Sequence, residues 1–272
     1  MEIIQYTFFQ HALLGSLFTA IACGIVGSYV VARRLVFISG GITHASWGGL
    51  GLGFYLGTNP IISALIFSIA SAFSVEWLSK KQGVREDSAI AAMWSLGMAL
   101  GVICIFLSPG YAPNISAYLF GNILTITQTD LWTIGLLALV LLVVFSLFLK
   151  PILYSAFDRE FAQTKGLPVV LIEHLMMLAI AITIVASIRL IGIMLLMSAL
   201  TIPQMTANIF SSKFQTIVIL SVLLGIAGNF AGLFLSSYLN VPSGAAIIFL
   251  QVIIFFICKM YLFAYQKAIK KT

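Results

Sequence analysis

The chain has 272 residues, of which 61% are hydrophobic and only 8% are charged. Soluble domains carry about 25% charged residues, so this composition excludes an ordinary soluble domain and a disordered chain. The net charge of +6 does not indicate nucleic-acid binding, because Lys and Arg lie in short clusters between apolar runs, as in a polytopic membrane protein.

Nine apolar runs, bounded by charged or turn residues, are candidate membrane spans. They cover residues 12–31, 38–56, 60–78, 88–107, 130–153, 168–188, 190–206, 214–238 and 241–265. Each is predicted to be a helix, because a segment in lipid must satisfy its own backbone hydrogen bonds. The shortest, 190–206, contains Pro203 and is expected to be bent or broken. The sequence therefore predicts an all-α polytopic membrane protein with about eight to nine transmembrane helices in one domain, 1–272.

The distribution of basic residues predicts the orientation of the chain. With the C-terminus in the cytoplasm, every Lys and Arg except Arg189 falls on or near the cytoplasmic side. The first basic residue is Arg33, so the charged start of a cleavable signal peptide is missing. We expect a multi-pass membrane protein with a cytoplasmic C-terminus.

Two segments between the spans are informative. Residues 109–130 are expected outside, and their apolar middle, 115–124, is too short to cross, which favours a re-entrant or surface helix. Residues 157–168, FDREFAQTKGLP, are polar, compatible with a helix and rich in both charge signs. This cytoplasmic segment is either a solvated loop or a docking helix for a soluble partner.

Most catalytic motifs are absent. There is no G-x-x-x-x-G-K-[ST], so the chain does not bind ATP through a P-loop, and there is no H-E-x-x-H. Glu173 and His174 are adjacent and would lie about 100° apart on a helix, so they cannot be paired ligands on one face. Three isolated cysteines form no C-x-x-C pair: Cys23, Cys104 and Cys258. An intramembrane enzyme is therefore not favoured.

His44 is the candidate functional residue of the second span, within ISGGITHASWGGLGLG. An ionisable group in a span is costly and usually faces a cavity or the bundle interior. Gly40 and Gly48 lie four residues to either side, which would leave the imidazole room. Neutral imidazole is a common transition-metal ligand. A hydrogen-bonded packing histidine is the alternative.

Small and polar residues mark two of the spans. A small-x-x-x-small run is formed by Gly49, Gly53 and Gly57. This spacing lets helices approach closely, so we expect a packing contact. Four residues surround Pro203 in the short span: Thr201, Gln204, Met205 and Asn208. They should face the interior, where they could line a permeation path or satisfy backbone groups freed by Pro203.

Five segments, in order along nearly the whole chain, resemble signature stretches of one family. They are LVFISGGITHASWGGLGLGFYLG, SPGYAPNISAYLFGNILTITQTDLW, FDREFAQTKGLPV, IRLIGIMLLMSALTIPQMTA and YLNVPSGAAIIFLQVIIFF. The family is the transmembrane permease subunit of bacterial ABC importers for zinc, manganese and related metal ions. The resemblance implies a type II ABC importer helix bundle in a bacterial inner membrane, with no ATPase activity of its own.

The resemblance also implies roles for individual residues. His44 matches the family histidine on the metal path, and we count Gly40, Thr43, Gln204 and Asn208 as further path candidates. The segment 157–168 would insert into a cleft of a separate ATPase through five residues: Phe157, Asp158, Glu160, Phe161 and Gly166. The implied partners are a second copy of the chain, two ATPase subunits that bind ATP, and an extracytoplasmic metal-binding protein.

One departure bears on the choice of metal. The family acid four residues before the histidine is replaced here by Gly40. Carboxylate oxygen suits manganese and nitrogen suits zinc, so the sequence favours zinc, with manganese next, as the transported ion rather than a permanently bound cofactor. The alternative is an ATPase-independent secondary transporter or channel, but neither inverted repeats nor mid-span acidic residues are evident.

Overall fold

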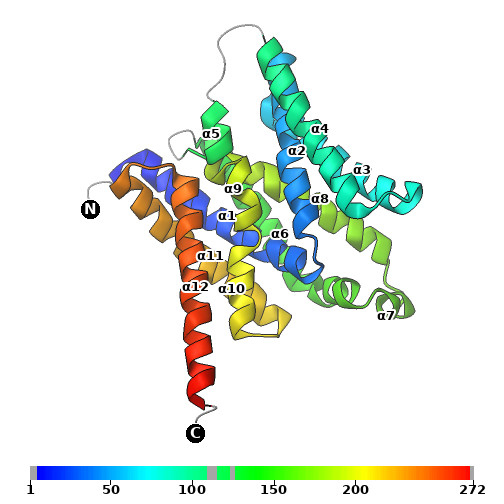
Figure 1. The fold of residues 1–272 in the computed structure, drawn as a ribbon, viewed down its shortest axis with the longest axis vertical. Coiled ribbons are helices and arrows are strands. Elements are labelled where there is room, and N and C mark those ends of the chain that lie inside the picture. The colour runs from blue at the N-terminus through cyan, green and yellow to red at the C-terminus, as the bar shows by residue number, and fades with distance from the viewer. Residues whose placement is uncertain (1–4, 109–114, 123–125, 270–272) are drawn as a thin grey trace.

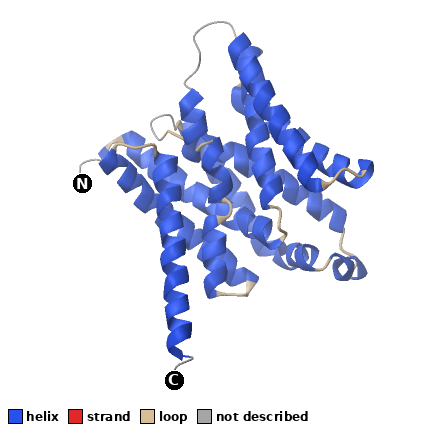
Figure 2. Cartoon of the chain, in the orientation of Figure 1, coloured by secondary structure: helices blue, strands red, loops and turns tan. Residues whose placement is uncertain are grey.

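The computed structural model describes residues 5–108, 115–122 and 126–269. Its regular secondary structure within these residues is helical throughout (Figure 2). The helices are α1 (Thr7–Ala32), α2 (Val36–Tyr55), α3 (Pro60–Gln82), α4 (Glu86–Leu107), α5 (Ile115–Phe120), α6 (Gln128–Phe157), α7 (Arg159–Thr164), α8 (Val169–Ile191), α9 (Ile193–Ala199), α10 (Ile202–Phe210), α11 (Phe214–Leu239) and α12 (Ser243–Ile269). A helix occupies each of the nine predicted spans.

Eight helical stretches in the described part are long and apolar enough to cross a membrane, one of them formed by α9 and α10 together. The predicted bundle of eight to nine transmembrane helices is confirmed. Helix α2 is not among the eight, because glycine, serine and His44 dilute its apolar residues. Most of α2 is nevertheless buried, against α3, α4, α8 and α9. A helix enclosed by other helices does not need an apolar surface toward lipid.

The helices form two packed groups around a shared interior (Figure 1). Helices α2, α3 and α4 pack together on one side, while α1 packs on α6 and α11 on the other. Helix α8 contacts both groups and contributes Ile180, Ile184 and Ile188 to the core. The outward faces carry large exposed apolar side chains such as Phe106 and Trp132, as a lipid-facing surface requires.

Local sequence signals set the ends of several helices. Thr127 and Asp130 form a capping box at the start of α6, in which each side chain accepts from the other residue's backbone N–H. Helix α3 ends at Gly83, which adopts the left-handed conformation (φ 68°) that glycine tolerates. Helix α6 bends at Phe148, three residues before Pro151, because proline cannot continue the helical hydrogen bonding.

The predicted break in the seventh span is confirmed, although it precedes Pro203. The chain turns at Gly192 (φ 86°) and again at Leu200 and Thr201. Pro203 lies in the first turn of α10, where its missing N–H costs nothing. The change of direction at position 192 requires glycine, because a Cβ at Gly192 would collide with the backbone around Leu119.

Helix α5 covers part of the apolar stretch 115–124 and packs against α8 and α9. Its C-terminal continuation is tied to the bundle by a hydrogen bond from the Asn122 N–H to the Arg189 carbonyl (3.1 Å). Residues 123 and 124 of the predicted segment, and the basic Lys270 and Lys271, lie outside the described residues.

Candidate functional site

His44 lies in the middle of α2 and is half-buried against α4. Its imidazole stacks on the indole of Trp94, with ring centroids 4.0 Å apart and planes 7° from parallel. Within the described part of the chain, no side chain or backbone group forms a hydrogen bond with the imidazole. The ring is therefore oriented by stacking, and its nitrogens remain available to a ligand.

The glycines on either side of His44 do not leave the open space that the sequence suggested. A Cβ at Gly40 would be 2.8 Å from Sδ of Met197, so the Met197 thioether of α9 occupies the room. A Cβ at Gly48 would be 2.9 Å from the carbonyl oxygen of Gly97 on α4. The two glycines thus allow α9 and α4 to approach α2 closely, and the atom that lies against Gly40 is the sulfur of Met197.

The side chain of Thr43 lies in the buried interior of the helix bundle. It is fully buried, and its hydroxyl donates a hydrogen bond to the Ser39 carbonyl one turn earlier (2.7 Å). Its oxygen is thus already engaged with the backbone of its own helix.

Gln204 and His44 lie at different helix interfaces: Gln204 of α10 contacts α1, whereas His44 of α2 contacts α4. Gln204 is fully buried, and its amide donates to the Cys23 carbonyl of α1 (2.8 Å), beside Gly27. It therefore satisfies a carbonyl of α1 rather than one freed by Pro203. Met205 and Asn208 of α10 are exposed, so the prediction that they face the interior is wrong for this chain by itself. Among the described residues, no group of three or more His, Cys, Asp or Glu side chains could hold a metal ion.

The three glycines Gly49, Gly53 and Gly57 have two different roles. A Cβ at Gly49 would lie 2.5 Å from Cα of Ala64, and one at Gly53 would lie 2.6 Å from Cα of Pro60, so both glycines permit close contact with α3. Gly57, expected to continue this contact, instead lies in the turn after α2. Its φ is 65° and nothing lies within 4 Å of its Cβ position, so the backbone conformation, not packing, requires glycine there.

The segment 157–168 contains a short surface helix, α7, rather than an irregular loop throughout. Asp158 caps it by accepting a hydrogen bond from the Phe161 N–H (2.9 Å), and Gly166 (φ 72°) follows its end. Phe157, Glu160 and Phe161 are all exposed. Two exposed aromatic rings beside charged groups form a surface suited to contact with another protein.

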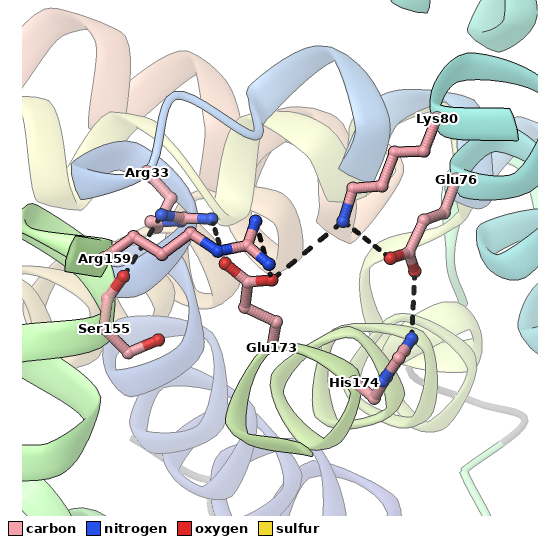
Figure 3. Close-up of polar contacts among 7 residues, drawn as sticks. All are labelled: Arg33, Glu76, Lys80, Ser155, Arg159, Glu173 and His174. Atoms are coloured by element: carbon pink, nitrogen blue, oxygen red, sulfur yellow. Dashed lines mark hydrogen bonds and ion pairs between the residues drawn. The ribbon is translucent and has the colours of Figure 1, made fainter. Parts of the chain in front are cut away.

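An ionic cluster lies between α7 and the transmembrane helices (Figure 3). Its six members are Arg33, Glu76, Lys80, Arg159, Glu173 and His174. We call this the basic-end cluster, and the end of the bundle that carries it the basic end. Glu173 and His174, which were not expected to act as paired ligands, have different partners: Glu173 faces the three basic residues, whereas His174 faces Glu76 (3.4 Å).

The sequence alone does not reveal this cluster, because its members come from four separate segments: the end of α1, α3, α7 and α8. The available signal was a set of charges at the ends of predicted spans, which does not reveal their pairing. Another unexpected pair joins Arg189 to Asp130 (2.8 Å). The one basic residue expected outside is thus paired with an acid.

Comparison with known proteins gives consistent results. A family model described as "ABC 3 transport family" matches residues 5–262. The manganese transport system membrane protein MntC of Halalkalibacterium halodurans is 32% identical, over 91% of this chain and 85% of the relative. The manganese import system permease protein ScaB of Streptococcus gordonii is 30% identical, over 93% and 91%. The structure of PsaBC from Streptococcus pneumoniae in complex with Fab aligns with a TM-score of 0.86 and 27% identity, over 94% of this chain and 92% of that one.

Proposed function

This chain belongs to the ABC 3 transport family, and we propose that it is the permease subunit of an ATP-driven importer for a divalent transition-metal ion. The observation that carries the proposal is the family match over nearly the whole chain, joined by relatives named for manganese transport and import. We place the protein in a bacterial cell membrane, with the basic end and the C-terminus in the cytoplasm, as the distribution of Lys and Arg favours.

Manganese is the ion that we propose first, because the named relatives transport or import it. Zinc is the second candidate, and the surroundings of His44 favour it. Gly40 offers no carboxylate, and the side chain that lies against Gly40 is the Met197 thioether. Nitrogen and sulfur donors suit zinc better than manganese, which prefers oxygen. The homology and the local chemistry thus favour different ions, and measured selectivity has to decide between them.

The mechanism we propose is alternating access. Two copies of the chain form the path, and two ATPase subunits receive α7 of each copy in a surface cleft. Closure of the ATPases on ATP moves α7 and opens the path to an extracytoplasmic metal-binding protein, and hydrolysis restores the inward-facing state. A transport site must bind weakly enough to release its ion. One histidine with few protein donors fits transit better than a closed four-ligand cage.

The test measures zinc, manganese and iron together in cells that express the permease with its ATPase and binding protein. We expect selective gain of one metal, abolished by His44→Ala in an assembled complex. His11→Ala is the matched control, because His11 is also a half-buried histidine within a transmembrane helix. Absence of any metal gain from an assembled, ATP-hydrolysing complex would overturn the proposal. Import that persists with an inactive ATPase would favour a secondary transporter or channel.

A further inference from the structure

Glu173 is the centre of the basic-end cluster. It lies in the second turn of α8 and is only 8% exposed. Its Oε1 accepts a hydrogen bond from Arg33 at the end of α1 (2.9 Å). Arg33 in turn donates to the Ser155 carbonyl near the end of α6 (3.1 Å). One buried carboxylate therefore holds the ends of α1 and α6 against α8.

The other oxygen of the same carboxylate is shared by two cations from different elements. Nη1 of Arg159, the first residue of α7, lies 3.6 Å from Glu173 Oε2. Nζ of Lys80, in the last turn of α3, lies 4.0 Å from the same atom. These two contacts are longer than the Arg33 contact, so they are the ones that a small movement can strengthen or weaken (Figure 3).

A displacement of α7 would change the position of Arg159 and thereby the strength of the contact between Lys80 of α3 and the shared oxygen. Lys80 also forms an ion pair with Glu76 on its own helix (2.7 Å), which contacts His174 on α8. When Arg159 withdraws, the charge of Oε2 is left to Lys80 alone, and when Arg159 approaches, it competes with Lys80. A cavity of about 160 Å³ bordered by Glu76, Lys80 and Glu173 gives these side chains room to move.

Helix α3 can carry the movement on to α2. The two helices are in near-backbone contact at Gly49 with Ala64 and at Gly53 with Pro60. Closely packed helices move together, because interiors are dense and deform little. Helix α2 carries His44, so a continuous physical route leads from α7 to the histidine.

We propose that Glu173 is a positioning residue that couples α7 to the transmembrane helices, through the Oε2 atom that Arg159 and Lys80 share. The proposal rests on the proposed function, in which α7 is the contact with the ATPase. In addition, a movement of α7 at that contact is transmitted to the transmembrane helices through the Glu173 carboxylate. A purely structural role would make Glu173 necessary for assembly, whereas the coupling role makes it necessary for the yield of transport per ATP.

The experiment uses the complex of permease, ATPase and binding protein reconstituted in vesicles. It measures co-purification of the ATPase, ATP hydrolysis and metal imported per ATP. For Glu173→Gln we expect an assembled complex that hydrolyses ATP but imports at least tenfold less metal per ATP. Arg159→Gln should lower the same ratio to a smaller extent, and Arg159→Lys should restore most of it. The double variant should resemble Glu173→Gln alone, because both changes interrupt one connection.

The matched control is Arg85→Gln. Arg85 also forms an ion pair, with Asp87 (2.8 Å), but this pair is exposed and lies outside the cluster. Its loss should leave the metal-to-ATP ratio unchanged. The inference is overturned if import and hydrolysis fall in parallel in Glu173→Gln, or if Arg159→Gln keeps the wild-type ratio. Arg159 is exposed, so its variant remains informative even if Glu173→Gln fails to fold. Failure of the wild-type complex to import any metal would instead overturn the proposed function.

Discussion

The imidazole of His44 and the indole of Trp94 lie face to face, 4.0 Å apart between centroids, and thereby join α2 to α4. Stacking fixes the plane of the imidazole without using either nitrogen. The histidine can then present a nitrogen to a passing ion without first giving up a hydrogen bond. This arrangement is compatible with the predicted ligand role of His44, and it places Trp94 beside the candidate site.

Replacing Trp94 should weaken metal transport by loosening the imidazole. Aromatic pairs contribute about 0.5–1.5 kcal/mol beyond their buried area, which corresponds to about a 2- to 10-fold change in affinity. We expect Trp94→Ala to raise the metal concentration for half-maximal uptake by about that factor, and Trp94→Phe to have a smaller effect. The measurement is the concentration dependence of metal uptake. An unchanged dependence in Trp94→Ala would show that the stack does not position His44 for the ion.

The second prediction concerns the stability of the close contact between α2 and α4. A Cβ at Gly51 would lie 2.5 Å from the Gly101 carbonyl oxygen. This oxygen belongs to the backbone, which cannot move aside as a flexible side chain can. Gly51→Ala should therefore destabilise the fold by about 1–3 kcal/mol, the usual cost of overpacking. Gly225→Ala is the control, because its Cβ would meet Ala20 at an ordinary 3.4 Å. Thermal unfolding in detergent measures both, and equal melting temperatures for the two variants would contradict the packing argument.

The helices were predictable from the sequence because apolar runs and their boundaries are local properties. The buried position of α2 was partly predictable, since its glycines signal close packing. Which helix each glycine meets was not: Gly49 meets α3, whereas Gly51 meets α4. The role of Gly57 in a turn depends on its positive φ, which the regular spacing of the glycine run concealed.

The candidate site was predictable only in part. His44 stands out because an ionisable group within a span is rare. Trp94 of α4, which stacks on His44, and Met197 of α9, which lies against Gly40, are not indicated by anything in the local sequence of α2. For the same reason the sequence does not reveal the pairing of Glu173, whose partner Arg33 is 140 residues away in the chain. Sequence patterns show which residues are unusual, whereas the tertiary structure decides which of them meet.

The third prediction concerns metal selectivity and the space in front of Gly40. Met197 Sδ fills this space, so an acidic side chain fits only if the thioether is shortened. The double variant Gly40→Asp with Met197→Ala should shift import toward manganese by several-fold relative to zinc, because a carboxylate oxygen replaces a sulfur. Met197→Ala alone is the control for the lost sulfur. Competition between the two metals in uptake provides the readout, and an unchanged ratio in the double variant would place selectivity elsewhere.

The fourth prediction concerns the surface of α7. Phe161 is 41% exposed and packs edge-on against Tyr154, with Lys165 lying over its ring. An exposed aromatic ring held in place on a capped helix is a typical anchor of a protein interface. Phe161→Ala should reduce co-purification of the ATPase about tenfold, since anchor residues of this kind contribute more than about 1 kcal/mol to binding.

A matched control for Phe161 separates loss of an interface from loss of apolar surface in general. Phe106, at the far end of α4, is 86% exposed, and the expected orientation places it toward lipid on the opposite side of the membrane. Phe106→Ala should leave ATPase co-purification intact, because no soluble partner reaches that end from the cytoplasm. Equal loss of the ATPase in both variants would mean that the effect comes from the stability of the bundle. Intact co-purification in Phe161→Ala would move the ATPase contact away from this ring, toward Phe157 or Glu160.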